Sequence, residues 1–127
     1  MRMNPKLAGM VLLAAGTLAA TTLAARPALA VGAVVNHVAL PPGTSIEACL
    51  QRGALAIASV GLRPLNTTRS AAWGEREGGR IYTIYCLPQN SVAIFVGAGN
   101  ASADVSPDVT ALMTAFRSGS GGGAPRK

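Results

Sequence analysis

The chain has 127 residues, of which 11 are basic and 5 acidic, and its formal net charge at pH 7 is +6. Three of the basic residues lie in the first 30 positions, so the rest of the chain carries 8 basic and 5 acidic residues and a net charge of +3. Because the arginines of this part are dispersed along the sequence, the composition argues against the clustered basic face of a nucleic-acid-binding protein.

The first 30 residues contain the three parts of an export signal in the right order. Two basic residues precede the uncharged stretch 7–25, and the small-residue cleavage site Ala28-Leu29-Ala30 follows. We expect cleavage before Val31 and a protein that works in the periplasm or the extracellular medium, since the alanine-rich signal is typical of bacteria. The alternative is an uncleaved membrane anchor, but Ala, Gly and Thr favour insertion only weakly. After cleavage we expect no stable membrane insertion.

The first elements after the signal are a strand and a helix. Residues 34–40 are rich in β-branched side chains and are followed by Pro-Pro-Gly, which predicts a strand that ends abruptly. Thr44 and Glu47 match the spacing of a capping box and predict the start of a helix. Apolar residues recur at helical spacing up to Val60, and Gly61 is suited to the left-handed residue that ends the helix.

Four further strands are predicted, joined by short turns. Gly78-Gly79 is typical of a two-residue hairpin turn, because both residues can adopt positive φ. The glycine-rich stretch 97–100 lacks the spacing of a dinucleotide-binding fingerprint and is interpreted as a turn. The predicted strands cover residues 62–68, 70–77, 80–87 and 91–96. The last of them is apolar on both faces, which favours a central position in the sheet.

A second helix closes the domain. Ser106 is a natural N-cap, Pro107 is favoured at the first helical position, and the negative charge of Asp108 suits the positive end of the helix dipole. The helix is expected to end near Arg117, and residues 118–127 form a Gly/Ser-rich tail. The order β-α-β-β-β-β-α over residues 31–117 predicts a two-layer α+β sandwich of two helices on a mainly antiparallel sheet of four to five strands.

The two cysteines are expected to form a disulfide. Cys49 lies on the apolar stripe of the first helix and Cys86 in the clearest strand, and export places both in an oxidising compartment. Their separation of 37 residues excludes a C-x-x-C redox motif. A zinc site requires about four ligands, and His37 is the only histidine that could join the cysteines. We therefore expect a staple between helix and sheet, with no metal and no cofactor.

The remaining polar residues argue against catalysis. His37 has no acidic neighbour in sequence that could orient it as a base. Each acidic residue has an ordinary structural role available to it, as a helix-terminal group or as part of a solvated hairpin. We therefore expect no enzymatic activity.

The hairpin around the single tryptophan is the best candidate for an interaction surface, made of Trp73, Glu75, Arg76 and Glu77. Trp73 either anchors a partner or covers one end of a thin core. The leading hypothesis is a non-catalytic exported module that binds a partner, for example a protein, through this hairpin or an exposed sheet face. An inhibitor or accessory subunit of an extracytoplasmic enzyme is the second hypothesis, and an enzyme with an undetected site is the third.

Overall fold

A computed structural model describes residues 31–119 of the chain; the predicted signal (1–30) and nearly all of the predicted tail lie outside these residues. The described part is an α+β fold with two helices and one five-stranded antiparallel sheet, as predicted. In chain order its elements are β1 (Gly32–Ala39), α1 (Ile46–Ser59), β2 (Arg63–Pro64), β3 (Ala71–Arg76), β4 (Arg80–Leu87), a short 3-10 turn (Pro88–Asn90), β5 (Val92–Gly99) and α2 (Ser102–Gly119). Within residues 31–119, no helix is long and apolar enough to cross a membrane.

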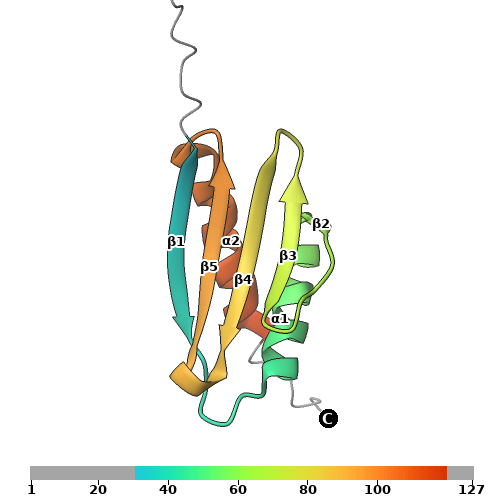
Figure 1. Ribbon diagram of the computed structural model, residues 1–127, viewed down its shortest axis with the longest axis vertical. Coiled ribbons are helices and arrows are strands. Elements are labelled where there is room, and N and C mark those ends of the chain that lie inside the picture. The colour runs from blue at the N-terminus through green and yellow to red at the C-terminus, as the bar shows by residue number, and fades with distance from the viewer. Residues whose placement is uncertain (1–30, 120–127) are drawn as a thin grey trace, which may run out of the picture.

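The sheet has the strand order β1-β5-β4-β3-β2, and both helices cover the same face of it (Figure 1). The last strand of the chain, β5, lies between β1 and β4, so the prediction of a central position for this strand is confirmed. The strands β1 and β2 form the two edges of the sheet, and an edge position suits β2 because Pro64 has no backbone N–H to donate.

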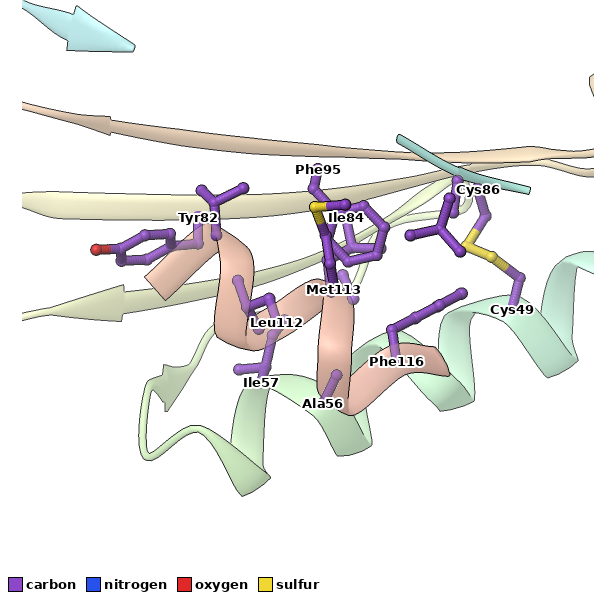
Figure 2. Packing of buried hydrophobic residues seen from close by; sticks show 14 of the residues in the cluster. Cys49, Ala56, Ile57, Tyr82, Ile84, Cys86, Phe95, Leu112, Met113 and Phe116 are labelled. Atoms are coloured by element: carbon purple, nitrogen blue, oxygen red, sulfur yellow. A yellow bond between two sulfur atoms is a disulfide. The ribbon is translucent and has the colours of Figure 1, made fainter. Parts of the chain in front are cut away.

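The core lies between the sheet and the two helices (Figure 2). Phe95 of β5 and Phe116 of α2 meet edge to face, with ring centroids 5.3 Å apart. At one end of this core, the predicted disulfide between Cys49 of α1 and Cys86 of β4 is present. The bond therefore joins the helix layer to the sheet.

Local geometry differs from the prediction at the N-terminus of α1 and at the β3–β4 hairpin. The N-cap of α1 is Ser45, whose hydroxyl accepts from the backbone N–H of Ala48, while Thr44 donates to Pro41 instead. The predicted capping box is therefore wrong by one residue. In the hairpin, Gly78 and Gly79 have positive φ as expected, but Arg76 pairs with Arg80, so the loop has three residues rather than two.

The glycine-rich stretch 97–100 is not the predicted turn, because β5 continues through it to Gly99. Gly97 faces the helix layer, and a Cβ atom at this position would lie 2.6 Å from a methyl group of Val109. The glycines therefore allow α2 to lie directly on the strand. A local interpretation as a turn missed this close approach between two layers.

The helix α2 begins at Ser102, four residues before the predicted cap, and contains Pro107 in its interior. Pro107 is tolerated one turn into the helix at the cost of one backbone hydrogen bond. Val105, in the additional turn, is fully buried against β5, and this packing favours the longer helix. The other end of α2 includes Ser118 and Gly119, which were assigned to the tail.

Candidate functional site

The sheet face opposite α1 and α2 is apolar, and no helix of residues 31–119 covers it. Strand alternation places one set of side chains on this face, and the antiparallel register aligns them in rows across β3, β4, β5 and β1. The rows are Glu75–Ile81–Ala98–Ala33, Trp73–Thr83–Val96–Val35, Ala71–Tyr85–Ile94–His37 and Leu87–Val92–Ala39. An antiparallel sheet with one solvated face normally carries polar residues there. We call these rows the open face.

Large apolar groups on the open face are in contact with solvent. Val35 is 66% exposed and Tyr85 is 37% exposed, whereas the outward side chains of β5 are half-buried. Beside the β1 edge there is a shallow hollow of about 290 Å³ lined by Val35, His37, Ile94 and their neighbours. The outward positions of β1, β5 and β4 contain no Asp, Glu, Lys or Arg. The part of the open face formed by β1, β5 and β4 is thus free of acidic and basic side chains other than the imidazole of His37.

Trp73 lies on the open face, near the sheet edge formed by β2. Its ring is half-buried and meets Tyr85 edge to face, with centroids 6.1 Å apart. Its indole Nε1 is buried and has no hydrogen-bond partner among the described residues. Next to the ring lies a hollow of about 500 Å³ whose other walls come from β2 and the loop after it. Trp73 therefore lies at the rim of the open face, with only part of its ring in contact with solvent.

The structure does not bring the four residues of the predicted hairpin surface together on one face. Trp73 and Glu75 point to the open face, and Glu75 forms an ion pair with Arg63 of β2. Glu77 is an exposed residue of the hairpin loop. Arg76 points to the opposite side, toward α2. Only Trp73 and Glu75 therefore contribute to the open face.

Arg76 belongs to a polar cluster between the sheet and α2. Its guanidinium donates two hydrogen bonds of 2.9 Å to the two carboxylate oxygens of Asp108, and one of 3.3 Å to the carbonyl of Val60. The hydroxyl of the fully buried Tyr82 donates to the same carboxylate at 2.6 Å. Asp108 was expected to act on the helix dipole at the first turn; it instead connects α2 to β3 and β4.

This environment shifts the acid–base properties of the cluster. Burial, together with the hydrogen bond to Asp108, raises the pKa of Tyr82 to about 12. Burial disfavours the charged carboxylate of Asp108, but the hydrogen bonds from Arg76 and Tyr82 outweigh this effect and hold its pKa below the ordinary value of 3.8. The cluster therefore favours a neutral tyrosine beside an ionised aspartate at neutral pH.

Comparison with protein-family models, with curated protein sequences and with solved structures found no match to this chain. The function is therefore argued from the geometry of the chain itself.

A third concave region lies beside the polar cluster and contains three arginines. It measures about 650 Å³ and is lined by Arg63, Arg76, Arg80, Glu75, Glu77 and two glycines. Each guanidinium already has an acceptor, which is Glu75 for Arg63, Asp108 for Arg76 and the carbonyl of Glu77 for Arg80. Glu75 and Asp108 offset the charges of Arg63 and Arg76, and the carboxylate of Glu77 also lines the pocket. The pocket is therefore close to neutral and is a weaker candidate than the open face.

The candidates for acid–base chemistry lie on two sides of the sheet. Tyr82 does meet an acid, Asp108, but its ring is fully buried in the core. His37 and Tyr85 lie on the open face, in one row with Ile94 between them. In residues 31–119 there is no group of three or more His, Cys, Asp or Glu side chains that could hold a metal ion.

The sequence predicts either the hairpin or an exposed sheet face as the binding surface, but it identifies neither Val35 nor the outward residues of β5 as part of that face. One signal was present. The strand that became β5 was noted to be apolar on both sides, which was interpreted as evidence of burial in the sheet. In the structure only one of its two apolar sides is covered by a helix.

Proposed function

We propose that this protein is an exported, non-catalytic binding module and that the open face is its binding surface. The observation that supports this proposal is an apolar sheet face that bears Val35 at 66% exposure and that neither helix of the described part of the chain covers. Contiguous apolar surface in contact with water is costly, and in soluble proteins it commonly marks an interaction site. The Trp73–Tyr85 pair at the rim adds the aromatic residues that interfaces favour.

A pair of matched variants tests the assignment of the surface. Val35 on β1 and Leu55 on α1 are both large, apolar and more than 60% exposed, but they lie on opposite layers of the molecule. We expect Val35→Glu to weaken binding of a solvatochromic hydrophobic dye, while Leu55→Glu leaves it near the wild-type level. Equal dye binding by both variants would contradict the proposal.

The biological partner can be sought with the same pair. Affinity capture from the compartment in which the protein occurs should recover a partner with wild type and Leu55→Glu but not with Val35→Glu. An inhibitor or accessory subunit, the second hypothesis, would be recognised by an enzyme among the captured proteins whose activity changes when the wild-type protein is added.

Export is part of the proposal. The Cys49–Cys86 disulfide supports an oxidising compartment, because disulfides are rare where thiols are kept reduced. N-terminal sequencing of the protein recovered from the cell envelope or medium should start at Val31. Recovery of Met1 would instead support the membrane-anchor alternative.

A further inference from the structure

We propose that the occupant of the open face is a second copy of this chain, giving a two-fold symmetric dimer in which the two sheets pack face to face. This inference rests on the proposed function, namely that the open face is a binding surface. It adds the identity of the partner, and three properties of the face support it.

The first property is shape. A β-sheet is twisted with a fixed hand, and two aligned sheets pack well when their twists are similar and their strands cross at about −30°. A second copy of the chain has the same twist as the first. The row structure of the open face, with half-buried side chains on β5 flanked by Val35 and Tyr85, provides the ridges that such packing interleaves.

The second property is charge. A two-fold axis brings each surface near its own copy, so a charged face repels itself, whereas an uncharged face does not. The open face has no formal charge on β1, β5 or β4, and its one acidic residue, Glu75, is paired with Arg63 at the β2 edge. A highly charged partner would find no group of opposite charge on β1, β5 or β4. This composition therefore favours self-association over a polar partner.

The third property is area. Four strands spaced by about 4.8 Å and about eight residues long, at about 3.3 Å per residue, span a flat area of about 500 Å². Two copies contribute about 1,000 Å² of flat area, and the accessible surface of side chains exceeds the flat projection. Specific interfaces bury about 1,200–2,000 Å² in total. The face is therefore large enough for a dimer of modest affinity.

The dimer is tested by sedimentation velocity and light scattering of the protein as recovered from its compartment, between about 1 and about 200 µM, a range that suits weak interfaces. Wild type and Leu55→Glu should change from monomer to dimer as the concentration rises. Val35→Glu and Val35→Lys should both raise the dimer dissociation constant by at least about 100-fold, because an unpaired charge of either sign would be buried twice per dimer. Far-UV circular dichroism and an intact Cys49–Cys86 bond verify that each variant is folded.

A substitution on an internal strand separates face-to-face packing from pairing at the β1 edge. Tyr85 lies on β4, two strands away from β1, so Tyr85→Glu should disrupt the dimer as Val35→Glu does. A dimer that is lost in Val35→Glu but retained in Tyr85→Glu would indicate edge pairing and overturn the proposal. A dimer that survives both substitutions would also overturn it.

A protein that is monomeric at every concentration would overturn the proposed dimer. Dye binding then tests whether the open face is a binding surface at all. If the monomer binds a hydrophobic dye in a manner that depends on Val35 and not on Leu55, the open face remains a binding surface for another partner. If dye binding is insensitive to Val35, both the dimer and the proposed function are wrong.

Discussion

Replacing Tyr82 by phenylalanine removes one hydroxyl group and leaves in place the ring that fills the core. The lost interaction is a 2.6 Å hydrogen bond to the carboxylate of Asp108, which keeps its two bonds from Arg76. A hydrogen bond to a charged group contributes about 1.5–3 kcal/mol, so we expect Tyr82→Phe to lower the free energy of unfolding by about this amount at pH 7.

The same variant should change the response to alkaline pH. The pKa of Tyr82 is raised to about 12 in the folded protein, from an ordinary value of about 10 in the unfolded chain. The neutral tyrosine therefore stabilises the fold fully below pH 10, and this contribution is lost as the pH rises from about 10 to about 12. Two pKa units correspond to about 2.7 kcal/mol. Wild type should lose up to this amount over that interval, and Tyr82→Phe should not.

Urea denaturation followed by circular dichroism at pH values of about 7, 9, 10 and 11 measures both the loss of stability at pH 7 and the response to alkaline pH. These pH values bracket the ordinary tyrosine pKa of about 10. Residues 31–119 contain no lysine, so deprotonation of lysine within this part of the chain does not overlap the loss attributed to Tyr82. Tyr85→Phe is the matched control, because Tyr85 is exposed on the other face of the sheet. Parallel alkaline losses in wild type and Tyr82→Phe, or an altered loss in the Tyr85 control, would refute the reasoning.

Three further perturbations have defined outcomes. Replacing Cys49 and Cys86 together by alanine should lower stability by about 3–4 kcal/mol in the chain-entropy estimate for a 37-residue separation, as read from the urea midpoint; an unchanged midpoint would contradict the role of a staple. Gly97→Ala should cost about 1–3 kcal/mol because its Cβ would collide with α2, whereas Gly53→Ala, whose nearest contact is 3.3 Å, should cost less because alanine also favours the helix. Asp108→Asn should be less stable than wild type at about pH 7, and the difference should shrink in acid. A carboxylate with a lowered pKa stabilises the fold above about pH 4, and this contribution is lost as the pH falls through the pKa of the folded protein. A stability difference that is constant from pH 7 to about pH 2 would contradict this expectation.

The order of elements and the disulfide could be predicted from the sequence because both depend on local signals. The spacing of apolar residues identified the helix that carries Cys49, and β-branched and aromatic residues identified β4, which carries Cys86. The boundaries were less accurate where tertiary contacts override local preference. Pro107 is a good first residue of a helix, yet packing of Val105 extends α2 by a further turn before it.

The role of Asp108 could not be derived from its neighbours in sequence. Its partners Arg76 and Tyr82 are 32 and 26 residues away, and they reach it only because α2 packs against β5, the neighbour of β4 in the sheet. The sequence interpretation, a charge near the start of a helix, was consistent with local chemistry but placed the residue in the wrong environment.

The open face shows most clearly what the sequence determined and what only the tertiary structure decided. Alternation along each strand, which is a property of the sequence, determined which residues share a side of the sheet, and the apolar character of both sides of β5 is visible in the residues alone. Whether a side is covered depends on where the helices pack. The disulfide of α1 and the glycines beneath α2 bring both helices to one side of the sheet, and the apolar residues of the other side are consequently left in contact with water.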